Sequence, residues 1–511
     1  MATFQVVYDD FSGGQYIGSR PANQPKNTWN GTNVIASPNG ELIPTGTRTL
    51  GTWDDGGSAG LILAHFYENV NGYLFTDAPR MVRYAHNNGL TTPISFTTYT
   101  PSVSGVLVSV AFSELHDRFY ALTASGTGGN LYHITKTGTA TLFHAFGAST
   151  FPQGTAIYKQ RVIVWARSKL YYSGVWTGSA YGAFNLSTQF YDFDSDIIAV
   201  FPRTDDLLVV CSDGTFSLTG VLGSGVTIQT LTPGANVSAG MRNGAIINRS
   251  LFYLDEFNSN GSIDGRLYRM IGASIQAVAS FEYGDYDFAD NGFNIADPGR
   301  VVALPNGRMA AQFRSGVTYF ESAPGVFAKS DVFDTLNTGT ARSSTGRYRL
   351  AEQMPGAPDE YILTAVIAAS SGSELDVTIY RTMANVPGPT KLDANFNYST
   401  NSTCIVNPSG TVKLSEYWHN KPFTVKEAFI EYSITTGGSV SCTIIPTGVV
   451  DVPAANLASV VSTAASETSP PAGDYRMYRY WPNNAAKGFG VIPELTITNC
   501  FVKRVILNCE D

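Results

Sequence analysis

A repeat with a period of 44 or 45 residues constrains this chain more than any other feature of its sequence. Short apolar strands are predicted around Phe75, Tyr120, Val164, Val209 and Tyr253, which are spaced 45, 44, 45 and 44 residues apart. A further apolar segment follows each of them, at 81–84, 131–134, 169–172, 215–218 and 266–270. Units of about 40–50 residues with four short strands are typical of β-propeller blades, which bury both faces only when neighbours stack on them.

A sixth copy of the pattern, at 307–313 and 317–320, follows after a longer interval. Period-2 alternation and turn dipeptides such as Asn306-Gly307 dominate the chain, whereas helical periodicity is hard to find. We therefore predict an all-β fold with a six- or seven-bladed β-propeller. Only residue class and position repeat, without a W-D or kelch motif, so a run of β-meanders with coincidental spacing is the alternative.

The pattern changes after Phe333. The segment 337–346 is rich in Thr, Ser and Gly, and later segments such as 423–434, 439–447 and 494–507 alternate between apolar and polar residues. Long alternating strands are typical of a β-sandwich or jelly-roll-like module. The sequence thus predicts an N-terminal arm (1–28), a β-propeller (29–345) and a β-sandwich-like module (346–511).

Charge limits the partners that the chain can have. The 33 Lys and Arg residues face 41 Asp and Glu residues, which gives a net charge of −8. This leaves no basic surplus to neutralise phosphates, so we expect no tight nucleic-acid binding by the surface as a whole. No run of 18 apolar residues occurs, and we expect no insertion into a membrane.

Chemistry-bearing motifs are sparse. The five Cys residues are scattered without a C-x-x-C pair, and none of the six His residues lies in a metal-ligand motif. We expect buried free thiols in a reducing compartment and no cofactor. A nucleophile elbow, a P-loop and a dinucleotide-binding fingerprint are also lacking, so we expect a protein that is not an enzyme and has no catalytic residues.

An aromatic and acidic segment at 281–297 is a candidate for a metal or catalytic site. Asp285 and Asp287 would share one face of a strand, with Asp290 close by, so a calcium site or a carboxylate pair for glycoside hydrolysis is one reading. The order of residues does not match a calcium loop, which favours a solvated loop or a subunit contact instead.

A second cluster combines aromatic and basic residues at 475–481, from Tyr475 to Trp481. Such residues can stack on a sugar or a base. A packed strand or an oligomer contact is the alternative interpretation.

The N-terminal residues resemble those of a known family. The sequence Asp9-Asp10-Phe11-Ser12-Gly13-Gly14 is followed by Trp29-Asn30-Gly31-Thr32-Asn33-Val34 and by Asn39-Gly40-Glu41-Leu42. These elements resemble the opening of bacteriophage short-tail nozzle proteins (the tail tubular protein B-like family), in which an F-S-G-G arm and hairpin elements lead into a propeller. The resemblance covers about 35 residues.

The resemblance implies a structural virion protein of a phage tail, assembled in the host cytoplasm into a hexameric ring around the DNA ejection channel. It also implies contacts with a tail adaptor and with fibre or spike proteins, while genomic DNA passes through without specific binding. Two other classes of function stay open. One is a glycan-binding receptor module, with a shallow aromatic pocket around 478–481. The other is a tailspike-like polysaccharide hydrolase, which needs facing carboxylates at the propeller centre.

Overall fold

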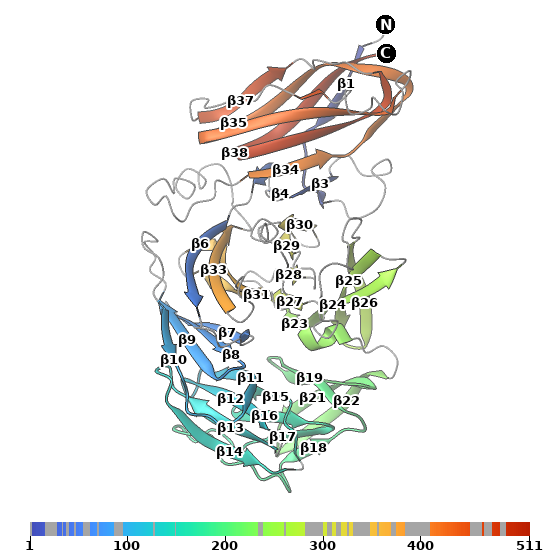
Figure 1. Ribbon diagram of the computed structural model, residues 1–511. Coiled ribbons are helices and arrows are strands. Elements are labelled where there is room, and N and C mark those ends of the chain that lie inside the picture. The colour runs from blue at the N-terminus through green and yellow to red at the C-terminus, as the bar shows by residue number, and fades with distance from the viewer. Residues whose placement is uncertain are drawn as a thin grey trace.

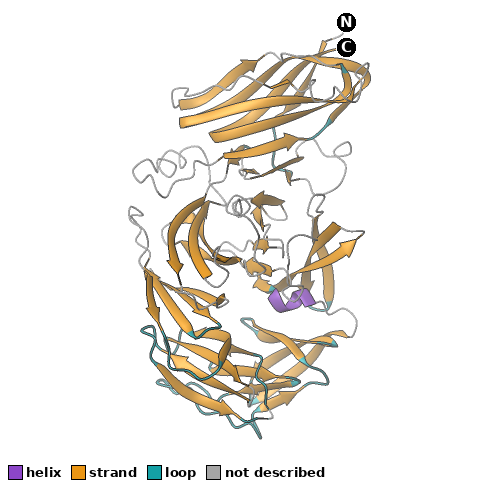
Figure 2. Ribbon diagram, in the orientation of Figure 1, coloured by secondary structure: helices purple, strands orange, loops and turns teal. Residues whose placement is uncertain are grey.

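Seven antiparallel four-stranded sheets follow one another around a ring, and a ten-stranded sheet forms a separate module (Figure 1). This arrangement is seen in a computed structural model. The structure describes residues 3–15, 28–32, 34–36, 40–44, 47–54, 62–68, 71–85, 96–125, 128–148, 150–233, 239–259, 262–281, 300–303, 309–312, 318–323, 326–330, 348–354, 357–368, 375–383, 409–449, 462–463, 473–480 and 487–511. Strands make up nearly all of the regular structure in these ranges, beside the short 3-10 helix η2 (Ala239–Asn243) (Figure 2).

Each sheet is one propeller blade, and the first strand of the blade lies nearest the ring centre (Figure 1). The strands of a blade are consecutive in sequence in blades 1 to 6, whereas the last strand of blade 7 comes from the N-terminal region. Blades 1 to 3 consist of β7 (Ile62–Glu68), β8 (Asn71–Thr76), β9 (Arg80–Ala85), β10 (Phe96–Tyr99), β11 (Val106–Ser113), β12 (Arg118–Ser125), β13 (Gly128–Ile134), β14 (Ala140–Phe146), β15 (Gly154–Tyr158), β16 (Arg161–Ala166), β17 (Lys169–Tyr172) and β18 (Phe190–Asp192). Blades 4 to 6 consist of β19 (Ile197–Pro202), β20 (Asp206–Cys211), β21 (Gly214–Val221), β22 (Gly225–Pro233), β23 (Ala245–Ile247), β24 (Ser250–Ser259), β25 (Ser262–Ile271), β26 (Ser274–Phe281), β27 (Arg300–Ala303), β28 (Met309–Gln312), β29 (Thr318–Ala323) and β30 (Val326–Ser330).

Residues from the two ends of the propeller sequence complete blade 7. Its strands are β31 (Tyr348–Met354), β32 (Ala357–Ala368), β33 (Leu375–Met383) and β6 (Thr47–Asp54). β6 pairs with β33 from Asp54 opposite Asp376 to Thr47 opposite Thr382. β31 contacts β7 of blade 1, which closes the ring.

The core of the propeller lies between the blades. The second strand of a blade is buried on both faces, and consecutive residues pack against opposite neighbours. In β12, Phe119 and Ala121 belong to a cluster with blade 1, whereas Tyr120 and Leu122 belong to a cluster with blade 3. Because neither face of an isolated blade would be shielded from water, the blades depend on one another for burial of apolar surface.

The repeat predicted from the sequence is confirmed. The five marker residues lie on the second strands β8, β12, β16, β20 and β24, and the segments after them lie on the third strands. The predicted sixth copy corresponds to β28 and β29. The chain is therefore an all-β protein with a seven-bladed propeller.

The second module is a single sheet that doubles over on itself. Its strands are β1 (Thr3–Tyr8), β2 (Gly14–Gln15), β3 (Thr28–Thr32), β4 (Val34–Ala36), β5 (Leu42–Pro44), β34 (Ser409–Leu414), β35 (Tyr417–Val449), β36 (Ser462–Thr463), β37 (Gly473–Tyr480) and β38 (Gly488–Glu510). The long strands β35 and β38 pair in three stretches, as 417–423 with 488–491, as 424–434 with 500–510 and as 439–449 with 488–498. Both halves supply buried residues to one core, which gives the sandwich-like module.

The predicted domain boundaries differ from the division between the sheets. Residues 348–383 were predicted to open the sandwich, but they form most of blade 7, and β6 joins them. The region 1–28 was predicted as a separate arm, but β1 is a strand of the sandwich sheet. Both differences have one cause: these strands pair with partners more than 300 residues away, where a local repeat leaves no trace.

Candidate functional site

The residues that carry the N-terminal resemblance converge in the sandwich core. Phe11, Trp29, Val34 and Leu42 are all buried in the same cluster. The Trp29 indole N–H donates a hydrogen bond to the Phe11 carbonyl oxygen over 3.1 Å. The Phe11 amide in turn donates to the carbonyl oxygen of Gly40 over 3.1 Å. The three motif elements therefore form one structural unit that anchors the N-terminal region in the module.

Gly40 is required at its position in this unit. Its φ of +77° is unfavourable for a residue with a side chain, and a Cβ there would lie 2.8 Å from Oδ1 of Asp10. That same Asp10 oxygen accepts a hydrogen bond from the Ser12 amide over 2.8 Å, which closes the turn after β1.

A second polar feature ties consecutive blades together. In blades 1 to 4, side chains at the turn between the first and second strands contact the next blade. Between blades 1 and 2, Lys136 bridges Glu68 and Asp117. Between blades 2 and 3, the Ser113 and Tyr181 hydroxyls are 2.7 Å apart. We call these contacts the inter-blade ties.

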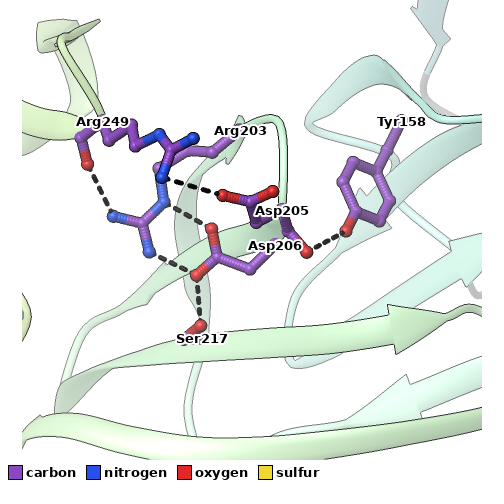
Figure 3. A network of polar contacts seen from close by, with 6 residues as sticks. All are labelled: Tyr158, Arg203, Asp205, Asp206, Ser217 and Arg249. Carbon is purple, nitrogen blue, oxygen red and sulfur yellow. Dashed lines mark hydrogen bonds and ion pairs between the residues drawn. The ribbon is translucent and has the colours of Figure 1, made fainter.

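The densest tie joins blades 4 and 5 (Figure 3). Arg203 donates from Nε to Asp206 Oδ1 at 2.6 Å and from Nη1 to the Arg249 carbonyl oxygen at 3.0 Å. Arg203 Nη2 and the Ser217 hydroxyl both donate to the other carboxylate oxygen of Asp206. Nη1 of Arg249 reaches back to Asp205 Oδ2 at 3.3 Å. Arg203 and Asp206 thus form a bidentate pair within blade 4, and the two contacts with Arg249 connect this pair to blade 5.

Blade 3 is joined to blade 4 from the other side of this network. The Tyr158 hydroxyl donates to the Asp205 carbonyl oxygen over 3.3 Å (Figure 3). Lys159 Nζ donates to the Gly220 carbonyl oxygen over 2.9 Å. Together with the other ties, these bonds link five consecutive blades along one face of the ring.

The inter-blade ties shift the pKa values of the charged side chains that form them. Burial acts to raise the pKa of Asp206, but the hydrogen bonds from Arg203 and Ser217 outweigh it and hold that pKa below its usual value. Burial likewise acts to lower the pKa of Lys136, and its bonds to Asp117 and Glu68 raise it instead. Both groups are therefore charged at neutral pH.

Sequence reasoning did not identify the ties, although a signal was present. A charged residue stands at the start of the second strand, or just before it, in several repeats. Three such turn residues, Asp117, Lys159 and Arg249, adopt positive φ values of 53°, 50° and 67°. Polar residues that recur at a strained turn position indicate a shared structural role.

Two His residues between blades 2 and 3 lie in an aromatic cluster. His116 Nδ1 is 2.7 Å from the Tyr120 hydroxyl, and His133 Nδ1 accepts a hydrogen bond from Arg118 Nη1 over 3.1 Å. Burial, followed by the charge of Arg118, lowers the pKa of His133 to about 4 and also lowers that of His116. Tyr120 is fully buried, so a substrate does not reach its hydroxyl.

In blades 2 to 5, the strands nearest the ring centre contain no charged residue, whereas the first strands of blades 1, 6 and 7 carry Glu68, Arg300, Arg349 and Glu352. β11, β15, β19 and β23 read VLVSVAFS, GTAIY, IIAVFP and AII, and so line the centre of blades 2 to 5 with aliphatic, aromatic and hydroxyl side chains. Carboxylates that would face one another across the centre do not come from these strands.

The predicted site residues have different outcomes. Asp285, Asp287 and Asp290 lie outside the described residues, as do Trp481 and Cys404. Within the described ranges, no group of three or more His, Cys, Asp or Glu residues is placed to hold a metal ion. In the aromatic cluster, Tyr478 and Tyr480 pair through the backbone with Ile430 and Ala428, which are fully buried.

The described cysteines are free and buried, as predicted: Cys211, Cys442, Cys500 and Cys509. Burial raises the pKa of Cys211 and of Cys509 to about 12, which leaves both thiols protonated at neutral pH. A helix long and apolar enough to cross a membrane is not found in the ranges that the structure covers.

Fold and strand pairing define the class of the chain as a seven-bladed β-propeller protein with a doubled-over sheet module. No family model matches the sequence, and no curated protein matches it. Among solved structures, the WD40 propeller domain of Doa1 is 10% identical and has a TM-score of 0.39, covering 65% of this chain and 96% of that one. YCF48 from Cyanidioschyzon merolae is 12% identical, with a TM-score of 0.39 and coverage of 65% and 98%. The β-propeller domain of Myceliophteria_thermophila Cps50 (Swd1) is 8% identical, with a TM-score of 0.39 and coverage of 64% and 98%.

Proposed function

We propose that this chain is a structural protein of a bacteriophage tail, the nozzle ring that surrounds the DNA ejection channel. The observation that carries the proposal is the convergence of Phe11, Trp29, Gly40 and Leu42, since the elements that resemble nozzle proteins act as one structural unit. The chain assembles in the host cytoplasm, and its partners are further copies of itself in a hexameric ring, a tail adaptor, and fibre or spike proteins.

Charge on the sandwich module supports passage of DNA without retention. Six of its described basic side chains lie close to acidic ones: Lys413 to Glu494, Lys421 to Asp511, Lys426 to Glu510, Arg479 to Glu427, and both Lys503 and Arg504 to Glu431. Acidic neighbours reduce the positive potential around these cations, and strong phosphate contacts would produce salt-dependent retention. A surface of this kind suits a conduit.

Mechanical stiffness supports the same role. The inter-blade ties link five blades along one face, and cores between the blades make each sheet depend on its neighbours. The apolar centre of blades 2 to 5 favours a structural role over hydrolysis, because glycoside hydrolysis needs two carboxylates roughly 5–10 Å apart. Catalysis and cofactor binding are therefore not part of the proposal.

Electron microscopy and native mass measurement of the purified protein test the proposal. We expect six-fold rings with an open axis. A trimeric spike, or a monomer that binds host glycans, would instead favour the receptor-module alternative.

A glycan-turnover assay addresses the hydrolase alternative. We expect host polysaccharide to remain uncleaved by the protein and by a variant with Asp285, Asp287 and Asp290 all replaced by Asn. Turnover that disappears in the triple variant would overturn the proposal.

A further inference from the structure

One layer of the sandwich module has two strand edges. In the order β1, β38, β35 and β37, residues 505–510 of β38 pair with β1 on one side and with β35 on the other. β35 pairs in turn with β37. Among the described residues, β1 pairs only with β38, and β37 pairs only with β35. Within the part of the chain that the structure describes, the layer therefore has one unpaired edge on each side.

The edge formed by β1 lacks the features that usually prevent pairing. Its sequence, TFQVVY, contains no charged residue and no proline. Its six residues pair with β38 in continuous register, without a bulge. An uncharged, regular edge strand offers its backbone N–H and C=O groups to another strand, and soluble proteins avoid leaving such an edge open. This edge therefore fits a β-strand partner.

Strand direction makes the two edges compatible with each other. β1 is antiparallel to β38, β38 to β35, and β35 to β37, so β1 and β37 run in opposite directions. When a second copy is placed beside the first in the same orientation, its β1 meets the first copy's β37 as an antiparallel neighbour. The sheet then continues from copy to copy without a change of pairing type.

A ladder of polar side chains crosses the outer face of this layer and points to the register. Arg479 donates to Glu427, Asn508 Nδ2 donates to Glu427 Oε2 at 3.1 Å, and Gln5 Nε2 donates to Asn508 Oδ1 at 2.9 Å. The ladder begins at β37 with a guanidinium group, which has five N–H donors, and ends at β1 with an amide that still has its carbonyl oxygen.

The geometry between Arg479 and β35 within one copy would be repeated between Arg479 and β1 of the neighbouring copy, on the other side of β37. Arg479 lies opposite Phe429 and bonds Glu427, two residues earlier on β35. β1 runs parallel to β35, so with Arg479 opposite Val7 of a second copy, the residue two positions earlier is Gln5. The donors of Arg479 would then reach the free carbonyl oxygen of Gln5.

We propose that β37 of one copy pairs in antiparallel fashion with β1 of the next copy, with Arg479 opposite Val7 and Tyr478 opposite Tyr8. The contact uses two different edges of the same chain, and is therefore a head-to-tail interface that produces a ring when the rotation between copies closes. The inference deepens the proposed function by naming the contact between copies. That this contact closes into a ring rests on the proposed function.

Cysteine cross-linking tests the pairing. Residues directly opposite on antiparallel strands have Cβ atoms about 4.5–5.5 Å apart, close to the separation that a disulfide spans. Within one copy, three strand spacings of about 4.8 Å separate Val7 from Arg479, which puts them about 14 Å apart. We expect Val7→Cys protein mixed with Arg479→Cys protein to give covalent dimers under mild oxidation, and the double variant to give higher covalent oligomers.

Two matched controls accompany this experiment. Each single variant alone and a mixture of Val7→Cys with Lys413→Cys, an exposed position on β34, are expected to give at least tenfold less cross-linked dimer. Dimers of equal yield in every mixture would overturn the proposal.

Charge variants at Gln5 test the register without a cross-link. Gln5→Arg places a cation beside Arg479 of the neighbouring copy, and we expect at least tenfold weaker association by sedimentation. Gln5→Glu offers a carboxylate instead and is expected to strengthen association several-fold at low salt. Thr411→Arg, an exposed charge control on β34, which pairs with neither β1 nor β37, is expected to leave association unchanged. Equal effects of the two Gln5 variants would contradict the register.

The inference and the proposed function fail separately. Six-fold rings without cross-linking between positions 7 and 479 would overturn the pairing and leave the nozzle proposal standing. Specific cross-linking in open filaments would support the pairing and contradict the ring.

Discussion

The indole nitrogen of Trp29 donates a hydrogen bond to the carbonyl oxygen of Phe11, 18 residues earlier in the chain. Both side chains are buried in the sandwich core, where Trp29 on β3 also pairs through its backbone with Leu414 on β34. A single contact thus ties the first residues of the chain to a strand that begins about 380 residues later.

This contact predicts different effects for two substitutions of Trp29. Trp29→Phe removes the hydrogen bond and part of the ring and should cost about 1–2 kcal/mol of unfolding free energy. Trp29→Ala also leaves a large cavity and should cost about 3–5 kcal/mol. Urea denaturation followed by circular dichroism measures both. Equal losses would show that the aromatic ring does not determine the packing.

An aromatic ring covers a glycine in blade 3, and this predicts a sensitive position. Gly154 lies opposite Trp165, and a Cβ on Gly154 would come within 1.9 Å of the indole ring. Gly154→Ala should therefore displace the ring and destabilise the protein by about 1–3 kcal/mol. Gly147 in the preceding connection has no atom within 4 Å of its would-be Cβ. The matched Gly147→Ala variant should stay within about 0.5 kcal/mol of the parent in the same thermal denaturation experiment.

Asp206 predicts a dependence of stability on acidic pH. Its pKa is lower in the folded protein than in the unfolded chain, where the usual value of 3.8 applies. Its contribution is therefore fully present above pH 3.8 and is lost as the pH falls through the folded-state value. Asp206→Asn should reduce stability at pH 7 by about 1–3 kcal/mol, because Arg203 and Ser217 lose a charged acceptor.

The pH profile of this variant is the decisive measurement. Below the folded-state pKa, the carboxyl group of the parent is protonated as well, so the stability difference between parent and Asp206→Asn should shrink. A difference that stays constant down to pH 2 would contradict the inferred role of the carboxylate.

The lowered pKa of His133 predicts a second pH dependence of the folding stability, at a higher pH than that of Asp206. Its pKa falls from 6.5 in the unfolded chain to about 4 in the folded protein. Between these values the unfolded chain binds the extra proton, so stability decreases as the pH falls from 6.5 towards 4. The ring is partly screened by solvent, and we expect a loss on the order of 1 kcal/mol. Removing the imidazole in His133→Gln should flatten this part of a urea-denaturation profile, and an unchanged slope would assign the loss to other groups.

The predictable part of the fold followed from local patterns. Strands such as β12 and β16 hold runs of apolar residues between turn signals, so their positions along the chain could be read directly. The sequence did not indicate which neighbouring blade each residue of these strands faces. Tyr120 and Val164 were aligned as equivalent, yet both pack in the cluster between blades 2 and 3, from opposite sides. Because both faces of a second strand are apolar, residue class does not distinguish them.

The parts of the fold and of the candidate site that could not be predicted from the sequence depend on contacts between residues far apart in the chain. The pairing of Thr52 with Thr378, and of Val6 with Leu507, joins residues that no local pattern connects. The charged turn residues Arg203 and Arg249 could be seen in the sequence, but their meeting depends on the stacking of two blades. The motif residues Phe11 and Trp29 were recognised by resemblance, whereas their mutual contact emerged only in three dimensions.

β6 completes blade 7 and β1 completes the sandwich sheet, and both strands have partners that are made more than 300 residues later. At about 5–20 residues per second, a ribosome needs roughly a quarter of a minute or more to reach those partners. During translation the N-terminal strands must therefore wait unpaired while the blades between them take shape. The propeller ring can therefore close once residues 376–382 have been made, whereas the sandwich sheet waits for residues 505–510.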